Sequence, residues 1–424
     1  MKRIRSFSAV VFLITLIMIL YLTINLETTY SYKAGPEAVL RDITVQAGNS
    51  NVKTQSPHVE SFTIPQPRVH NMSISDDFRN SIPHNQAYWN RLLHLSLKNL
   101  DKWDDPLRHD PHWSHCTKNE ELLKTNIPDF SSYPVLFQDF VRGMSCMSSP
   151  VLISQPNKCI SQEGRRGNQT LLLLAIKSAP WNFEQRQAVR ETWGRERVYH
   201  GGLRVRRVFV LGNSPLEHPD LSPLLSFEAN NFGDLLQWDF KETFLNLTLK
   251  MNLFFQWTLK HCPHASFVFS GDDDVFVNTP RMVSYLLSLK GSQAYQLFVG
   301  DVIKTASPLR DPKIKYYVPL SFYDGPYPAY AGGGGFLFSG QLLKSLYSVS
   351  HFVPFFPIDD VYIGMCAKAM GISPQAHSEF LTFDIKVQDR ENLCAYKDII
   401  LIHKRLPVEL KQLWKGIHSP FLTC

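Results

Sequence analysis

The sequence has no concentrated basic patch, although its formal net charge is +6 over 424 residues. Lysine and arginine are spread along the chain rather than gathered in a tail or in one segment. That distribution argues against nucleic acid as the main partner and stays compatible with a small anionic ligand. The sequence also has no internal repeat and no low-complexity tract, which excludes a solenoid or a repeat array.

Cysteine is scarce and shows no metal-binding pattern. The seven cysteines contain neither a CxxC pair nor the Cys/His spacing of zinc sites. In an oxidising compartment most of them would form disulfide bonds, with one left over, and a single sequence does not give the pairing. They are Cys116, Cys146, Cys159, Cys262, Cys366, Cys394 and Cys424.

Only one uncharged run is long enough to cross a membrane. Residues 7–26 carry no charge and follow three basic residues near the amino terminus, and about 20 apolar residues span a bilayer. The positive-inside rule makes residues 1–6 a cytoplasmic tail and places residues 27–424 in the lumen. The alternative is a cleaved signal peptide. It is disfavoured because the run is too long and no small-x-small site precedes Glu27.

The lumenal part divides by composition into three segments. Residues 27–85 are rich in Ser, Thr, Asn, Gln and Pro, which predicts a poorly ordered stem. Residues 86–164 contain three cysteines and few strand signals, and we expect this preamble to pack on the main domain, residues 165–424. In the lumen, three N-glycosylation acceptor patterns become candidate sites for glycans. They begin at Asn71, Asn168 and Asn246.

Short apolar runs in the main domain predict buried strands. They span residues 171–176, 205–211 and 265–269, and a helical segment is expected over 183–193. Strands alternating with helices predict an α/β fold with a mainly parallel central sheet. In such sheets ligands bind beyond the carboxyl ends of the strands, so the polar residues after these runs are candidates for a site.

Three adjacent carboxylates, Asp272, Asp273 and Asp274, follow the third of these runs. Adjacent negative charges repel one another unless a cation neutralises them, and carboxylate oxygens suit Mn²⁺ or Mg²⁺. A solvated acidic turn is the alternative. Because both flanks are apolar and strand-like, we favour a site for a divalent metal and a sugar nucleotide.

Three cations lie near the first strand. Lys177 follows it, and Arg186 and Arg190 lie four residues apart on the expected helix. One helical face would then present both guanidinium groups toward a diphosphate or a nucleotide pocket. The alternative pairs them on the surface with Glu184 or Glu191.

A glycine-rich segment stands between aromatic residues at 327–336. It is neither a Walker loop nor a GxGxxG loop. Glycines such as Gly333 and Gly334 let the backbone approach a ligand closely and adopt positive φ, so we interpret the segment as a wall of the sugar site. An ordinary flexible loop is the alternative.

A second acidic pair, Asp359 and Asp360, stands far from the first. Sugar transfer with inversion needs one carboxylate to deprotonate the attacking hydroxyl, although either residue could instead cap a helix. His403 ends a late apolar run, and a lone histidine of this kind is more often structural than a metal ligand.

The motifs of residues 165–424 resemble the β-1,3-glycosyltransferases of glycosyltransferase family 31. The glycine-rich segment and the sequence PIDDVY at 357–362 resemble the subgroup of β-1,3-N-acetylglucosaminyltransferases that extend poly-N-acetyllactosamine. The motifs that carry the family resemblance are LLAIKS at 173–178, RxxxRxTWG at 186–194, DxxxTxxNLTxK at 239–250, GDDDVFV at 271–277 and FVGD at 298–301.

The resemblance implies a GT-A fold, UDP-GlcNAc as donor, Mn²⁺ or Mg²⁺ as cofactor and a β-galactose-terminated glycan as acceptor. It puts Asp274 and His403 on the metal, Asp272 and Asp273 near the ribose and donor sugar, and Asp360 in the role of general base. It further implies a Golgi type II membrane protein, which could form oligomers with itself or with other glycosyltransferases. A galactosyltransferase, a non-catalytic glycan-binding protein and a cleaved secreted protein are the rival interpretations.

Overall fold

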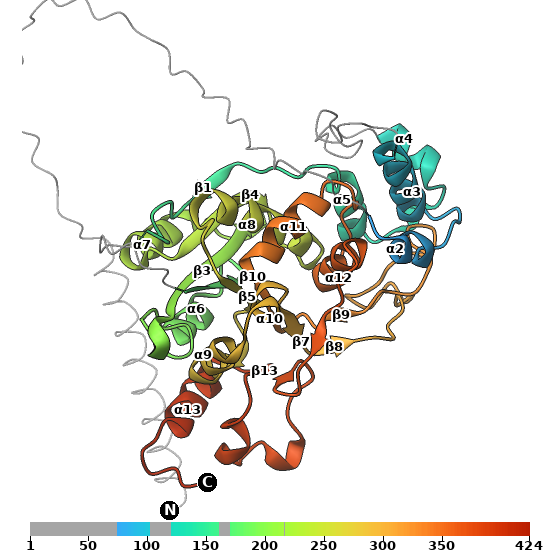
Figure 1. The fold of residues 1–424 in the computed structure, drawn as a ribbon. Coiled ribbons are helices and arrows are strands. Elements are labelled where there is room, and N and C mark those ends of the chain that lie inside the picture. Colours follow the sequence, from blue (N-terminus) through green and yellow to red (C-terminus); the bar gives the residue numbers. More distant parts are fainter. Residues whose placement is uncertain (1–73, 102–119, 161–169, 216) are drawn as a thin grey trace, which may run out of the picture. The chain divides into compact units, whose positions relative to one another are not determined.

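Seven consecutive buried residues form the central strand β2, Leu171–Lys177, as the apolar run predicted. The computed structural model describes residues 74–101, 120–160, 170–215 and 217–424. Around β2 these residues build a mixed eight-stranded sheet in the order β1-β4-β3-β2-β5-β10-β7-β11 (Figure 1). Its other strands are β1 (Val151–Ile153), β3 (Arg204–Asn213), β4 (Leu235–Lys241), β5 (Phe267–Asp272), β7 (Phe298–Gly300), β10 (Gly335–Ser339) and β11 (Gln375–Ala376).

The middle of the sheet is parallel, as expected for strands alternating with helices. Strands β4, β3, β2 and β5 run in the same direction, whereas β1 and β10 pair antiparallel to the outer members of that group. The carboxyl ends of β2 and β5 are therefore adjacent, and Lys177 is in register with Asp272. The polar residues that follow the apolar runs of β2 and β5 therefore lie at this edge of the sheet.

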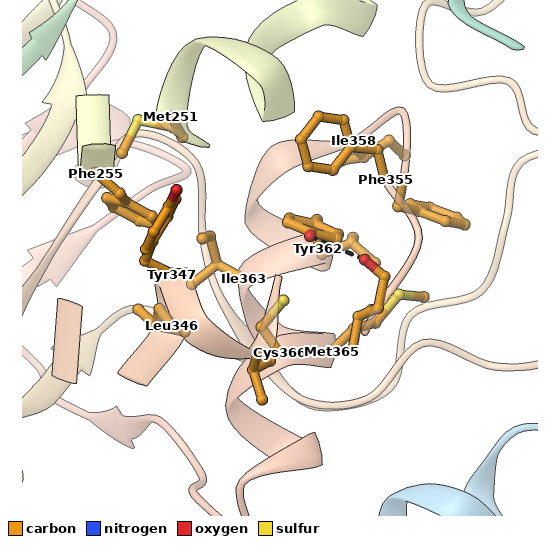
Figure 2. Packing of buried hydrophobic residues seen from close by; sticks show 14 of the residues in the cluster. Met251, Phe255, Leu346, Tyr347, Phe355, Ile358, Tyr362, Ile363, Met365 and Cys366 are labelled. Carbon is orange, nitrogen blue, oxygen red and sulfur yellow. Dashed lines mark hydrogen bonds between the residues drawn. The ribbon is translucent and has the colours of Figure 1, made fainter. Parts of the chain in front are cut away.

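Helices cover both faces of the sheet because successive residues of β2 point to opposite sides. Leu171 and Leu173 pack with α8 (Leu247–His261), α11 (Gly340–Val349) and α12 (Asp359–Ala369). Figure 2 shows side chains of α12 packed beside Met251 and Phe255 of α8 and Tyr347 of α11. The opposite face packs with α6 (Phe183–Glu191), α7 (Ser222–Phe232), α9 (Thr279–Ser288) and α13 (Pro407–Ile417).

Two smaller sheets complete the carboxyl edge. Strand β6 follows the acidic turn directly and pairs with β13, so that Val275 is in register with His403. The three-stranded sheet contains β12 (Phe380–Leu381), β13 (Leu401–His403) and β6 (Val275–Val277), and the two-stranded sheet contains β8 (Val302–Ile303) and β9 (Tyr330–Ala331). The short remaining elements are α10 (Ser292–Tyr295), η1 (Phe130–Ser132), η2 (His200–Gly202), η3 (Phe244–Asn246), η4 (Val387–Asp389) and η5 (Leu393–Tyr396).

The segment before the sheet packs on α12 and on the residues just before it. Trp89 of α3 is fully buried, its ring lies 5.6 Å from that of Phe356, and its indole Nε1–H donates to the carbonyl of Pro354 at 3.0 Å. Helix α2 buries Phe78 and falls inside the stretch whose composition predicts a stem, so folded structure begins earlier than residue 86. The four helices here are α2 (Asp76–Ser81), α3 (Tyr88–Leu100), α4 (Glu120–Asn126) and α5 (Val135–Gly143).

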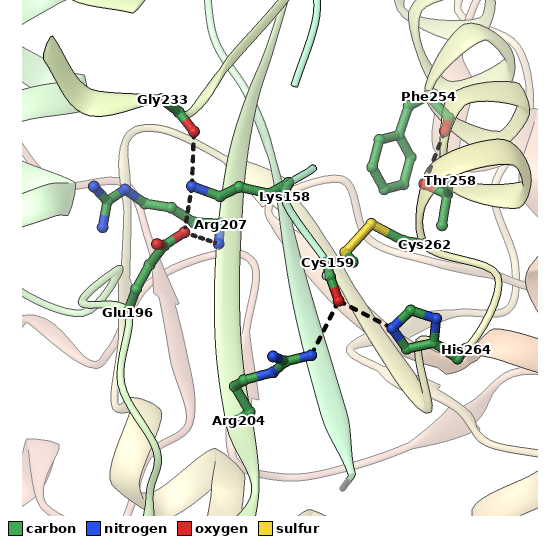
Figure 3. The surroundings of a disulfide bond; sticks show 10 residues. All are labelled: Lys158, Cys159, Glu196, Arg204, Arg207, Gly233, Phe254, Thr258, Cys262 and His264. Atoms are coloured by element: carbon green, nitrogen blue, oxygen red, sulfur yellow. Dashed lines mark hydrogen bonds and ion pairs between the residues drawn. A yellow bond between two sulfur atoms is a disulfide. The ribbon is translucent and has the colours of Figure 1, made fainter. Parts of the chain in front are cut away.

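Disulfide bonds join two pairs of described cysteines. Cys159 bonds to Cys262 at the end of α8, and Cys394 bonds to Cys424. The carbonyl of Cys159 also accepts hydrogen bonds from Arg204 and His264 (Figure 3). Cys366 of α12 is free and buried, and burial raises the pKa of its thiol, so it remains an unreactive core residue.

Some sequence predictions fall on residues outside the described ranges. The expected anchor at 7–26 and the acceptor residues Asn71 and Asn168 are among them, and no helix among the described residues is long and apolar enough to cross a membrane. Asn246 is described: its Nδ2 donates to the carbonyl of Lys241 at 2.9 Å. The hydroxyl of Thr248, the third residue of that pattern, is buried and donates to the carbonyl of Phe356 at 2.6 Å.

Removing the Cys159–Cys262 bond should lower the stability of the fold. The bond closes a loop of 103 residues, and its loss in a double Cys→Ala variant should cost about 4–5 kcal/mol through the added entropy of the unfolded chain. Thermal unfolding followed by circular dichroism would measure the change. The matched control removes Cys394–Cys424, which closes 30 residues and should cost about 1 kcal/mol less; equal melting temperatures for wild type and the first variant would contradict this expectation.

Candidate active site

Asp272, Asp273 and Asp274 form an acidic turn after β5, and their side chains have different surroundings. Asp272 ends β5, and the turn of Asp273 and Asp274 leads into β6. Asp273 is 6% exposed, and its Oδ2 accepts hydrogen bonds from Ser178 at 2.6 Å and from Asn182 at 2.9 Å. Burial raises the pKa of Asp273 to about 6. Its carboxylate thus ties the acidic turn to the loop that follows β2.

Lys177 is the buried cation of the site. Its Nζ lies 3.1 Å from Asp272 Oδ1 and 2.8 Å from Asp359 Oδ2, and it donates to the carbonyl of Gly333 at 3.4 Å. Burial alone would lower the pKa of this ammonium, but the two carboxylates outweigh it and hold the pKa above its ordinary value. The three partners occupy its donors, so Lys177 connects both acidic clusters and the glycine-rich segment instead of extending into open space.

Asp272, Asp274 and His403 form a set of potential metal ligands. One ligand atom from each residue lies within 4.8 Å of the others. His403 Nδ1 lies 3.1 Å from the carbonyl of Thr382, and because a carbonyl only accepts, Nδ1 carries a proton. In the neutral imidazole the lone pair is then on Nε2. Nε2 is 3.6 Å from Asp274 Oδ1, a buried oxygen with no hydrogen-bond partner. Two electron-pair donors facing one another at this distance fit a cation between them.

Two side chains of the site lie close to the backbone of the glycine-rich segment. A Cβ atom at Gly333 would lie 3.1 Å from Asp360 Oδ2, and one at Gly334 would lie 3.0 Å from the Cβ of His403. Neither glycine has a positive φ. These two positions favour glycine because side chains from α12 and β13 approach the backbone closely, not because of a left-handed conformation.

Asp359 and Asp360 begin α12 but have different partners. Asp359 is buried and ion-paired with Lys177. Asp360 accepts a hydrogen bond from the backbone N–H of Val361 at 2.8 Å, and its other oxygen faces Gly333. Burial first, and then the charge of Asp359, raise the pKa of Asp360 to about 7. A carboxylate with this pKa suits proton transfer near neutral pH.

Arg186 and Arg190 are both buried and ion-paired with acidic residues, and the predicted nucleotide contact stays a prediction. Arg186 is fully buried and paired with Glu228 at 2.7 Å, while Arg190 pairs with Glu228 and Asp234, both at 2.7 Å. Their partners are also not the surface acids Glu184 and Glu191 of the alternative interpretation. Arg186 does reach the site indirectly, since its Nη1 donates to Ser178 at 3.2 Å, which in turn binds Asp273.

Sequence reasoning missed several supporting residues. Asn182 donates a hydrogen bond to Asp273, and the carbonyl of Thr382 accepts one from His403. Asp301 Oδ2 accepts a hydrogen bond from the backbone N–H of Thr382 at 3.1 Å. Asp301 ends one of the quoted motifs, which was the only available signal for it. Nothing in the local sequence around Thr382 indicates that its carbonyl would orient His403.

The galactosyltransferase family model matches residues 184–378. N-acetyllactosaminide β-1,3-N-acetylglucosaminyltransferase 2 of Mus musculus is 44% identical over 355 residues, covering 80% of this chain and 86% of the relative. The Homo sapiens protein of that name is 43% identical over 352 residues, with the same coverage. Mus musculus acetylgalactosaminyl-O-glycosyl-glycoprotein β-1,3-N-acetylglucosaminyltransferase is 42% identical over 304 residues, covering 70% of this chain and 76% of the relative. The chain belongs to glycosyltransferase family 31, alongside these β-1,3-N-acetylglucosaminyltransferases, and is therefore a hexosyltransferase.

Replacing Lys177 with methionine should destabilise the protein by about 3–5 kcal/mol, because the buried Asp359 and the half-buried Asp272 lose their cation. The orphaned carboxylates would have folded pKa values above their unfolded values of about 4. The destabilisation is then full above the folded pKa and shrinks as the pH falls and protonation neutralises them. Chemical denaturation at pH 5 and pH 8 would measure this difference.

Lys411→Met is the matched control, since its pair with Glu191 is exposed and should contribute under about 1 kcal/mol. A Lys177→Met variant as stable as this control at pH 8 would contradict the buried-pair account.

Proposed function

We propose that this protein transfers N-acetylglucosamine from UDP-GlcNAc to the 3-hydroxyl of a terminal β-galactose, with inversion at the anomeric carbon. The main support is the 44% identity over 355 residues to a relative whose name states β-1,3-N-acetylglucosaminyl transfer to N-acetyllactosaminides. Two features of the site agree with it: a ligand set at the end of β5 and a carboxylate with a pKa of about 7 beside the glycine-rich segment. The mixed sheet flanked by helices fits a GT-A fold.

The donor side of the proposed site consists of Asp272, Asp274 and His403. These residues would hold Mn²⁺ or Mg²⁺, with Thr382 fixing the imidazole so that Nε2 faces the metal position. A divalent cation bound there would neutralise the diphosphate and stabilise its departure. Asp272 keeps one carboxylate oxygen toward Lys177, which leaves the other oxygen for the metal. Asp273 does not face the metal position but holds the acidic turn in place through its hydrogen bonds to Ser178 and Asn182.

The acceptor side of the proposed site is Asp360. Its neighbour Asp359 is neutralised by Lys177, which leaves Asp360 as the carboxylate able to accept a proton. In the proposed reaction Asp360 removes the proton of the galactose 3-hydroxyl while that oxygen bonds to the anomeric carbon. The bond from the anomeric carbon to UDP breaks in the same displacement, so the configuration inverts.

The proposed setting is the Golgi membrane, with residues 7–26 as a type II anchor and residues 27–424 in the lumen. The run of uncharged residues behind a basic amino terminus supports it, and so do the disulfide bonds, which form in oxidising compartments. A glycan at Asn246 would be attached before folding buries Thr248. Association with itself or with other glycosyltransferases is part of the same proposal.

An Asp360→Asn variant should retain its fold and lose about 10²- to 10⁴-fold in kcat, the usual contribution of a general base. Transfer from UDP-GlcNAc to N-acetyllactosamine would be followed by product mass, with UDP-Gal offered in parallel. For the wild type, kcat should rise with pH through about 7, because only the ionised form of Asp360 accepts the proton.

The exposed Asp220→Asn change is the control and should leave turnover unaltered. Near wild-type turnover by Asp360→Asn would remove this residue from the mechanism. Transfer of galactose in place of N-acetylglucosamine would assign the chain to the galactosyltransferases.

Asp274→Ala should abolish Mn²⁺-dependent activity and weaken the binding of Mn²⁺ in the presence of UDP by at least about tenfold, since one of three ligands is lost. Isothermal titration calorimetry measures the binding without turnover. Asp220→Ala is the control for removing one acidic residue. Unchanged Mn²⁺ affinity in Asp274→Ala would show that the metal binds elsewhere.

A further inference from the structure

Arg405 lies just beyond β13 and has no part in the reaction as described so far. It stands two residues after His403, and its side chain is 8% exposed. Its backbone N–H donates to the carbonyl of Asp274 at 2.7 Å. Its guanidinium donates through Nη2 to Asp384 Oδ1 at 2.6 Å. One residue therefore contacts both the acidic turn and the loop that follows β12.

Asp384 holds this loop in an unusual conformation. Its φ is 79°, and it is the only residue other than glycine with a positive φ in the described ranges. Such a conformation is costly and persists where the surroundings hold it. Here Oδ1 accepts from Arg405 and from the backbone N–H of Ile385 at 2.7 Å, and Oδ2 lies 2.8 Å from Arg390 Nη2. The shape of the loop therefore depends on what its carboxylate binds.

The loop matters because it continues from the carbonyl that orients His403. Thr382, two residues before Asp384, accepts the Nδ1–H bond of His403, and its own backbone N–H donates to Asp301 Oδ2. Asp301 thus fixes the peptide before Thr382, and the loop fixes the peptide after it. The contacts close a ring around the candidate metal position, through Asp274, Arg405, Asp384, Thr382 and His403.

We propose that Arg405 and Asp384 are positioning residues for the metal, and that their ion pair keeps His403 Nε2 facing Asp274 Oδ1. The inference rests on the proposed function, in which these two ligand atoms share a divalent cation. Arg405 acts on both sides of the 3.6 Å gap between them: its backbone holds the acidic turn, and its side chain holds the loop. Arginine suits this role because its guanidinium is always charged and presents several donors in a fixed plane.

The test measures Mn²⁺ binding to the full-length chain in the presence of UDP by isothermal titration calorimetry. Arg405→Met should weaken binding about tenfold, the lower end of the usual effect of removing a partner of a metal ligand. Asp384→Asn should cause a smaller loss, because asparagine tolerates the left-handed backbone and keeps an acceptor but not the charge. Arg405→Lys should recover part of the affinity, because it restores the charge without the planar group.

A double variant tests whether the two residues act as a pair. Arg405→Met combined with Asp384→Asn should bind Mn²⁺ about as well as Arg405→Met alone, because both changes remove one interaction. Losses that multiply instead would mean that the two residues act separately, which overturns the proposed pair.

The matched control is Arg281→Met. Arg281 Nε donates to Glu379 Oε2 at 2.9 Å, so this pair lies at the opposite end of β12 from Asp384. Its loss should leave Mn²⁺ affinity unchanged. Wild-type affinity in Arg405→Met, or equal losses in Arg405→Met and Arg281→Met, would overturn the positioning role.

Nitrogen-15 NMR of the histidine rings reads the orientation of His403 without metal or turnover. At pH 8 the wild type should show His403 with its proton on Nδ1, whereas Arg405→Met should show a mixture of both tautomers. A general loss of stability would not change this ratio while circular dichroism shows an intact fold. If the wild type binds no Mn²⁺, the metal of the proposed function fails. If it binds Mn²⁺ but the tautomers of the two proteins are the same, only the positioning role fails.

Discussion

The buried ammonium of Lys177 joins three parts of the chain that are distant in sequence. It contacts Asp272 at the end of β5, Asp359 at the start of α12 and the carbonyl of Gly333 in the glycine-rich segment. A buried cation is tolerated only when its partners are held in place, so these elements must meet at one edge of the sheet. The same pairing neutralises Asp359 and leaves Asp360, beside it, as the carboxylate with a pKa near neutrality.

The glycine-rich segment lets side chains from two distant elements lie close together in the site. Asp360 approaches it at Gly333, and His403 approaches it at the next residue. Because glycine at both positions allows this close approach, a carboxylate suited to proton transfer and an imidazole suited to metal binding lie against adjacent residues. His403 arrives there because β13 pairs with β6, which directly follows the acidic turn.

Local pattern predicted much of this structure. The apolar runs located β2, β3 and β5 to within a few residues, because strands buried on both faces need continuous apolar sequence. A four-residue spacing placed the two arginines of α6 on one helical face but could not indicate what that face contacts. Arg186 and Arg190 contact Glu228 and Asp234, more than 40 residues further on, and no local pattern records such a pairing. The predicted stem was too long because α2 buries a single aromatic residue, Phe78, too weak a signal within a polar stretch.

The sequence by itself determined the α/β class, the family and the clustering of acids between apolar flanks, because these depend on residue types and spacings along the chain. Only the tertiary structure decided the role of each acid. It turned Asp273 inward to Ser178 and paired Asp359 with Lys177. It also placed His403 opposite Asp274. Identical carboxylates acquire different charge states and partners from their surroundings in space, and adjacent residues in the sequence do not share those surroundings.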